Sequence, residues 1–574
     1  MNLKTFVFLG LINTMAAAGA PAEGIIYPHR WVFVSRSLQA GTDVDDIREI
    51  ARVAAEHGLN GIVLSAGLDR LDLQPPAYFQ RLAEVKKIAE QFSLEIIPQI
   101  FSAGYGSAII SHNRNLAEGL PVKNALFVAH EGLAVLEPDP AVRIINGGFE
   151  DYNGNQARGY SYHDRPGEVS FIDSTNFHSG AVSLNFRNFE KFQYGHARVM
   201  QELPVQPYRC YRVTVWVKTQ ELKGDISIQI LSTTGRAMAP LTFKVPATTD
   251  WRKLTAGVNT QSENRIRVYV GVWGGEGGTF WVDDLAIEEV GLTNVVRRPG
   301  TPVAVRSDKN EMTYQEGVDF GPIVDPQLTF RFDHDGPQIR LMPGSRISEG
   351  ERLRVNYYHG ISINDGQVTI CMSEPEVYEI WSNTARLVHE HLAAQHYLLS
   401  MDEIRAGGSD EACQRREMSM AQILGDCITR QVGMIRLVNP VAEIAIWSDM
   451  LDPNHNAKNN YYLVDGDYTG SWEHVPQDLV IMCWYYAKRW DSLKHFSGLG
   501  FRTFAGAYYD GDTLDNPRDW LQVLDQTGGA IGIMYTTWQN KYALLPAFGD
   551  LVSQRGKFKG RRRPSFSPAT NSSK

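Results

Sequence analysis

Short apolar runs alternate with amphipathic segments over the first hundred residues of the chain. Three of these runs, at residues 31–34, 61–64 and 94–98, are continuous, which is typical of strands buried on both faces. Between the first two, apolar residues recur at helical spacing from Val44 to Ala54. This order predicts βα units whose strands run parallel.

The pattern breaks after about residue 104 and returns after residue 365, where six more apolar runs occur. They cover residues 368–371, 396–399, 443–446, 479–482, 503–506 and 531–534. Three strands before the break and five after it predict a (β/α)8 barrel, with the run at 368–371 outside the eight. An open doubly wound sheet is the alternative. We favour the barrel because no glycine-rich phosphate-binding turn follows any run, whereas polar and aromatic residues end nearly every one.

The segment between the two parts of the barrel has a different pattern. Residues 143–290 contain short period-2 strands, turn signals and no convincing helix, which predicts an inserted all-β sandwich. Residues 291–365 stay rich in β patterns and are expected to form a small accessory segment. The predicted fold is therefore an α/β barrel in two parts, residues 23–142 and 366–555, interrupted by a β-sandwich.

The two ends of the chain predict export and a disordered tail. Residues 1–22 combine Lys4, a short apolar run and a series of small residues, which is the pattern of a secretory signal peptide. We therefore expect a secreted or periplasmic protein, and no later apolar run is long enough for an integral membrane segment. Residues 556–574 are basic and polar, as in disordered tails.

Charge and cysteine usage narrow the classes of ligand. The formal net charge is −9, which argues against nucleic acid as a partner. The 5 cysteines are scattered without a CxxC pair or zinc-finger spacing, so neither a disulfide framework nor a zinc site is indicated. We expect buried free thiols; if a single bridge forms, Cys413 with Cys427 is the expected pair.

Alternation within the sandwich places three aromatic residues away from its core. In residues 213–217 and 267–273 the valines share one face, whereas Trp216, Tyr269 and Trp273 lie on the other. These rings either form a stacking platform for sugars or pack against the neighbouring domain.

The opening and closing segments of the sandwich resemble those of jelly-roll carbohydrate-binding modules. The opening is Asn146-Gly147-Gly148-Phe149-Glu150, and the closing run extends from Gly278 to Leu285. Such modules often hold a structural calcium ion near an opening Glu and a closing Asp. The resemblance therefore implies a structural Ca²⁺ site at Glu150 and Asp283, with turn and edge carboxylates that bind no metal as the alternative.

Carboxylates and aromatic rings follow the predicted C-terminal barrel strands. In chain order they are Asp402, Glu403, Trp447, Asp449, Trp484, Tyr508, Asp510 and Trp538. Active sites of such barrels are built at the C-terminal ends of the strands. Rings that stack on sugar faces, beside carboxylates for acid–base chemistry, are the lining expected of a sugar pocket.

The order of these residues resembles glycoside hydrolase family 20, the exo-acting β-N-acetylhexosaminidases, and related barrel glycosidases. The resemblance implies that Glu403 is the general acid and base of a retaining reaction. Asp402 then orients the 2-acetamido group of the substrate, whose own oxygen is the nucleophile. Tyr508 is implied to hydrogen-bond that acetamido oxygen.

The same resemblance implies a set of substrate-binding residues and no catalytic cofactor. Trp447, Trp484 and Trp538 are expected to wall the pocket, with Asp449 and Asp510 beside them. An early arginine is expected to bind the sugar hydroxyls, and Arg30 or Arg36 can take that role. The expected partner is an oligosaccharide or glycoconjugate.

The chain departs from the family pattern at two strand ends, and two other functions remain open. Leu399-Ser400-Met401 stands where the family usually has His-x-Gly-Gly, and Gln99 stands where a carboxylate is common. One alternative is a two-carboxylate glycosidase in which Asp449, Asp510 or Glu374 partners Glu403. The other is a non-catalytic glycan-binding protein.

Overall fold

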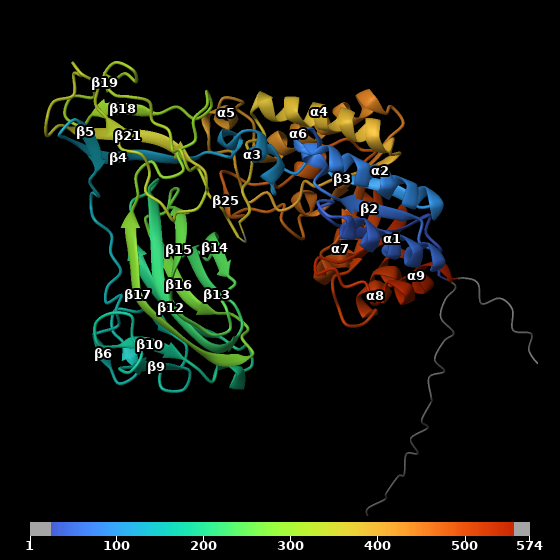
Figure 1. The fold of residues 1–574 in the computed structure, drawn as a ribbon, viewed down its shortest axis with the longest axis horizontal. Coiled ribbons are helices and arrows are strands. Elements are labelled where there is room, and N and C mark those ends of the chain that lie inside the picture. Colours follow the sequence, from blue (N-terminus) through green and yellow to red (C-terminus); the bar gives the residue numbers. More distant parts are fainter. Residues whose placement is uncertain (1–23, 365, 556–574) are drawn as a thin grey trace, which may run out of the picture.

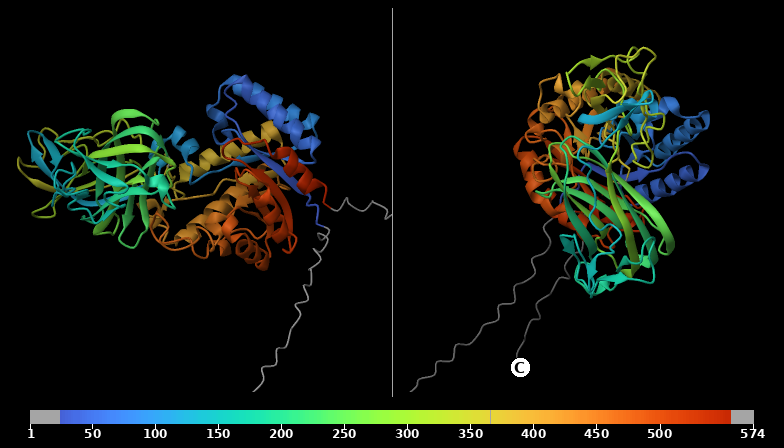
Figure 2. Two further views of the ribbon diagram at one scale, coloured as in Figure 1. Left: turned by 90° about the horizontal axis from the view of Figure 1, so that it is seen from below. Right: turned by 90° about the vertical axis from the view of Figure 1, so that its left-hand side faces the viewer.

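The computed structural model describes residues 24–364 and 366–555; the predicted signal peptide and basic tail lie outside them. Figure 1 shows a barrel with helices at one end of the molecule and β-sheets at the other. The views in Figure 2 show that the β-sheets project from one side of the barrel. Within the described residues, every helix is too short or too polar to cross a membrane.

Eight parallel strands form the closed barrel. In spatial order they are β1 (His29–Ser35), β2 (Gly61–Ser65), β3 (Glu95–Ile100), β22 (His396–Leu399), β24 (Glu443–Trp447), β26 (Val480–Cys483), β27 (Arg502–Tyr508) and β28 (Ala530–Thr536). The ring closes at β1, where Trp31 lies opposite Gly61 of β2 and Met534 of β28. The predicted barrel is confirmed, and the run at residues 368–371 lies outside it, as predicted.

Both faces of the barrel strands are buried, which explains their continuous apolar runs. On β1, Trp31 and Phe33 point into the barrel, whereas Val32 and Val34 pack against the outer layer. The rings of Trp31 and Phe504 meet inside, with centroids 4.6 Å apart. A Cβ atom on Gly532 would lie 2.1 Å from the Phe504 ring, so only glycine fits at that position.

Helices cover the barrel after seven of its eight strands. They are α1 (Gly41–Glu56), α2 (Pro76–Gln91), α4 (Pro375–Leu392), α6 (Met420–Val438), α7 (Arg489–Gly498), α8 (Asp515–Leu524) and α9 (Leu545–Ser553). The link between β24 and β26 is the exception, because residues 448–479 contain 3-10 turns and a two-residue strand but no α-helix. The fold is therefore a (β/α)8 barrel with one helix missing from the outer layer.

The inserted sandwich consists of two five-stranded antiparallel sheets. The first has the order β15 (Thr249–Asn259), β12 (Cys210–Lys223), β17 (Gly277–Glu289), β10 (Ser183–Phe186) and β9 (Ser170–Asp173). The second has the order β14 (Ala237–Phe243), β13 (Ile226–Ser232), β16 (Arg265–Val272), β11 (Ala197–Pro204) and β8 (Tyr162–His163). The valines of β12 and β16 are fully buried in one shared core, as the alternation predicts.

A third, six-stranded sheet joins the sandwich to the barrel. Its order is β19 (Thr313–Tyr314), β18 (Ala304–Ser307), β21 (Arg352–His359), β4 (Leu120–His130), β5 (Leu133–Leu136) and β20 (Ile339–Arg340). The predicted boundary at residue 142 assigned β4 and β5 to the barrel, which is wrong. Both strands belong to the accessory sheet, because β4 pairs along its length with β21.

The five cysteines are buried and free, as expected. The sulfur of Cys413 lies 3.7 Å from that of Cys371, so its neighbour is Cys371 rather than Cys427.

Replacing Phe504 by alanine tests the packing of the barrel interior. The ring is fully buried, so its loss should lower the free energy of unfolding by about 3–5 kcal/mol. Leu437→Ala on α6 is the control, because that side chain is 83% exposed and its loss should change stability by less than about 0.5 kcal/mol. Urea unfolding followed by circular dichroism measures both, and equal losses would contradict the assigned core.

Candidate functional site

A pocket of about 450 Å³ opens at the C-terminal end of the barrel. Residues at or just beyond the C-terminal ends of all eight strands line it: Phe33, Ser35, Ser65, Gln99, Tyr105, Ser400, Asp402, Glu403, Trp447, Trp484, Tyr509 and Trp538. This volume is within the range of about 300–1,000 Å³ typical of small-ligand pockets. The structure thus brings together five of the residues predicted from strand ends.

Aromatic rings form one wall of the pocket. Trp484 and Tyr509 stack with their centroids 5.8 Å apart and their planes 4° from parallel. Trp538 lies edge-on to Tyr509 at 6.3 Å and also contacts the ring of Trp447 at 6.2 Å. Trp447 is buried, whereas Trp538 is 49% exposed, so the wall extends from the barrel core to the pocket mouth.

Asp402 and Glu403 belong to the loop that follows β22. Ser400 donates a hydrogen bond of 3.1 Å to Asp402 Oδ1, and Gln99 donates one of 3.1 Å to Ser400. Glu403 has a left-handed backbone with φ of 49°, a conformation that non-glycine residues rarely adopt. Its N–H donates a 2.8 Å hydrogen bond to Asp449 Oδ2, which fixes this turn.

Two donors hold the carboxylate of Glu403. Arg405 forms an ion pair of 2.8 Å with Oε1, and the Tyr105 hydroxyl donates to Oε2. The side chain of Arg405 is only 5% exposed, whereas that of Glu403 is 23% exposed and that of Tyr105 lies at the surface. Glu403 therefore occupies the mouth of the pocket, with a fixed orientation.

Asp402 and Asp449 are poorly solvated, and both hold protons more tightly than ordinary carboxyls. Burial, reinforced by the nearby charge of Glu403, raises the pKa of Asp402 to about 6. Burial, together with the charge of Asp402, raises the pKa of Asp449 to about 8. Asp402 is therefore mostly charged above pH 6.

Asp449 is a supporting residue and does not line the pocket. It is fully buried, and besides the Glu403 N–H it accepts the side-chain amide of Asn456 at 2.9 Å and the indole N–H of Trp484 at 3.3 Å. It thereby links the loop after β22 to the aromatic wall.

Two residues predicted after β27 lie beside the pocket without lining it. Tyr508 is buried, with its ring stacked on Tyr535 at 4.0 Å. Tyr509, the next residue, enters the pocket instead. Asp510 accepts the backbone N–H of Trp538 at 2.8 Å and so holds the loop that carries this ring.

The predicted arginines do not reach the pocket. Arg30 lies at the start of β1, at the opposite end of the barrel, where it donates to the carbonyl oxygens of Tyr27 and Gly58. Arg36 follows β1 but pairs with Asp46 at 3.1 Å. The arginine at the pocket is Arg405, which sequence reasoning missed, as it missed Tyr105; both follow barrel strands within six residues.

The three aromatics of the sandwich do not form one platform. Trp216 is on β12 and stacks on His178 at 3.8 Å, whereas Tyr269 is on β16 and Trp273 directly follows it, in the other sheet. Tyr269 lies 6.2 Å from Trp273 and 6.4 Å from Tyr162, which is partly exposed. Alternation assigned each ring to an outer face but could not tell which sheet it belongs to.

Glu150 and Asp283 lie together, next to Gly148. Glu150 accepts the backbone N–H of Ala181 at 2.7 Å, and the buried Asp283 accepts those of His178 and Ser179. These hydrogen bonds occupy carboxylate oxygens of Glu150 and Asp283 that a calcium ion would also need as ligands. The Ca²⁺ site therefore stays a prediction.

Comparisons with known proteins match short parts of the chain. No family model and no curated protein matches it. A family 61 carbohydrate-binding module in complex with β-1,4-galactotriose is 20% identical, with a TM-score of 0.20, and covers 25% of this chain and 95% of its own. The xylan-binding CBM22-1 domain of Paenibacillus barcinonensis is 14% identical, with a TM-score of 0.20, and covers 27% of this chain and 100% of its own.

Removing the Asp449 carboxyl tests its supporting role. Asp449→Ala should leave the Glu403 and Asn456 donors unpaired in a dry environment, at about 1–3 kcal/mol each. Asp449→Asn keeps an acceptor, so its free energy of unfolding should fall clearly less. Asp512→Ala, on the exposed surface, is the control, and its free energy of unfolding should hardly change. Free energies of unfolding decide the matter: equal stability of the Ala and Asn variants would refute this role.

Proposed function

We propose that this chain is a glycosidase that removes one terminal sugar unit bound in the barrel pocket. The observation that carries the proposal is the meeting of the carboxyls of Asp402 and Glu403 with three indoles and two phenols around one cavity. Flat rings stack on the C–H faces of a pyranose, and carboxyls transfer protons to and from glycosidic oxygen.

The shape of the barrel supports action on chain ends. Below the pocket, the interior is filled by packed side chains, among them Trp31, Phe33 and Phe504. A sugar can therefore enter from one end only, and the rest of the glycan must remain outside the mouth. This arrangement favours exo-hydrolysis.

Glu403 is the residue proposed to protonate the leaving oxygen. It lies at the mouth, where the bond between the bound sugar and the rest of the glycan would be. After it gives up its proton, its carboxylate is stabilised by the ion pair with Arg405 and by the hydroxyl of Tyr105. The same carboxylate would then take a proton from the attacking water, as general base.

Asp402 is proposed to orient the 2-acetamido group of the substrate. It accepts a hydrogen bond from Ser400 and lines the pocket together with Tyr509, which can donate to the acetamido oxygen in the role first assigned to Tyr508. The acetamido oxygen would attack the anomeric carbon, so that no enzymic nucleophile is required.

The position of the other carboxyls supports this scheme over two-carboxylate catalysis. Asp449 is fully buried, Asp510 is bonded to the Trp538 loop, and Glu374 pairs with Arg298 outside the pocket. A second acid facing Glu403 across the sugar is therefore not provided by these three residues. A non-catalytic glycan-binding protein is the remaining alternative, and it predicts binding without turnover.

Glu403→Gln tests the general acid. Hydrolysis of a phenyl N-acetyl-β-glucosaminide should fall by about 10²–10⁴-fold, because a poor leaving group needs the proton. A dinitrophenolate leaving group departs without protonation. With a dinitrophenyl glycoside, the rate of glycosidic bond cleavage in the variant should therefore fall much less. Glu90→Gln, exposed on α2, is the matched control and should behave as wild type. Equal losses of activity on both substrates would exclude Glu403 as the general acid. If the wild-type protein turned over neither substrate, the glycan-binding alternative would be favoured.

The charge state of Asp402 predicts how ligand binding depends on pH in the acidic range. Its raised pKa of about 6 means that the charged, orienting form is present above pH 6 and is lost as the pH falls through that value. Binding of an N-acetylglucosamine thiazoline, which mimics the intermediate, should therefore weaken below pH 6. Asp402→Asn should bind it weakly at every pH, and a wild-type profile in that variant would contradict the assignment.

A further inference from the structure

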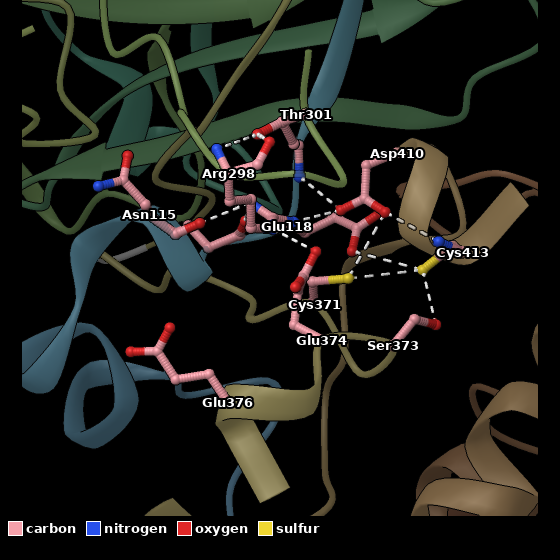
Figure 3. A network of polar contacts seen from close by, with 12 residues as sticks. Asn115, Glu118, Arg298, Thr301, Cys371, Ser373, Glu374, Glu376, Asp410 and Cys413 are labelled. Atoms are coloured by element: carbon pink, nitrogen blue, oxygen red, sulfur yellow. Dashed lines mark hydrogen bonds and ion pairs between the residues drawn. The ribbon is translucent and has the colours of Figure 1, made fainter. Parts of the chain in front are cut away.

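A second cluster of reactive side chains lies where the inserted sheets join the barrel (Figure 3). Glu118 precedes β4 and Cys371 precedes α4, while Asp410 and Cys413 lie at the start and within α5 (Glu411–Gln414). All four side chains are buried, with exposed fractions between 0% and 3%. None of them lines the pocket described above.

The donor atoms of these residues are arranged around one point. The two sulfur atoms are 3.7 Å apart, and Cys371 Sγ lies 3.5 Å from Asp410 Oδ1. One atom from each residue can be chosen so that all lie within 4.8 Å of one another. Tetrahedral zinc, with bonds of about 2.3 Å to sulfur and 2.0 Å to oxygen, separates two sulfurs by about 3.8 Å and sulfur from oxygen by about 3.5 Å.

Glu118 provides an independent indication that a cation belongs here. Its Oε1 accepts the backbone N–H of Ser409 at 3.0 Å, but the nearest bonding partner of Oε2 is Cys413 Sγ, 4.0 Å away. Arg298, the neighbouring cation, directs its side-chain N–H groups to Asp410, Glu374 and backbone oxygens. A buried carboxylate oxygen whose side-chain donor is a distant thiol is weakly satisfied, and a metal ion at this point would replace that contact with a full bond.

We propose that Glu118, Cys371, Asp410 and Cys413 bind one structural zinc ion. Two thiolates and two carboxylates complete a four-coordinate shell, and the two thiols release their protons to solvent on binding. Supporting contacts are already present: Arg298 holds the outer oxygen of Asp410, and the Ser373 hydroxyl lies 3.2 Å from Cys413 Sγ. With four protein ligands the site has no open position for substrate.

The ion would join three segments that are far apart in the sequence. Glu118 lies where the chain leaves the barrel for the inserted sheets, and Cys371 lies where it returns. Asp410 and Cys413 end the loop that begins at β22 and carries Asp402 and Glu403. Zinc would therefore anchor the insert to the pocket loop, and its removal should lower the melting temperature of the whole protein.

The test is metal analysis of the full chain purified from zinc-supplemented medium. Elemental analysis should find one zinc per chain in wild type and in Asp402→Asn, whose change lies in the pocket. Cys371→Ser and Cys413→Ser should each lose stoichiometric zinc. Cys210→Ser is the matched control, because Cys210 is also a buried free thiol but lies in the sandwich.

A measurement on wild type keeps the test decisive if the serine variants fail to fold. Titration with an organic mercurial should release one zinc per chain, detected by a metallochromic dye, and cobalt-loaded protein should show thiolate-to-cobalt charge-transfer absorption. Wild type without stoichiometric zinc or cobalt would overturn the proposal. So would a disulfide between Cys371 and Cys413 found by peptide mass spectrometry.

Discussion

A hydrogen bond between the N–H of Glu403 and the buried carboxyl of Asp449 positions the loop on which the pocket depends. The bond connects the ends of two neighbouring barrel strands and holds Glu403 in its left-handed conformation. Asp449 also accepts the indole N–H of Trp484, so one buried carboxyl orients both Glu403 and an aromatic ring of the pocket wall. Because its acceptor Asp449 is fully buried, the bond is stronger than it would be at the surface.

The sequence predicts those parts of the fold that depend on burial alone. Barrel strands are short and apolar on both faces, so each could be placed within a few residues. The sheet to which an alternating strand belongs is not encoded locally, because any edge offers the same backbone donors and acceptors. For this reason β4 and β5 were assigned to the wrong domain, and Trp216 was grouped with Tyr269 although they belong to different sheets.

The sequence predicts those residues of the site whose positions are determined by the ends of the barrel strands. Asp402, Glu403 and the three pocket tryptophans directly follow or end strands, and the barrel brings these ends together. The family resemblance points to Tyr508, whereas Tyr509 lines the pocket. Three consecutive positive φ values at residues 508–510 turn the chain there, and a pattern of residue types does not show such a turn. The cluster around Cys371 combines residues 118, 371, 410 and 413, and such distant positions give no spacing motif.

The loop that carries Trp538 has a consequence for recognition. Asp510 accepts N–H groups from both Trp538 and Gln539, so this half-exposed ring is anchored through its backbone before any ligand arrives. A ring held in this way loses little conformational entropy when a ligand stacks on it, and more of the stacking energy remains as affinity. Selectivity at this wall would then follow from the shape of the ligand, because a rigid surface cannot adjust to a poorly matched one.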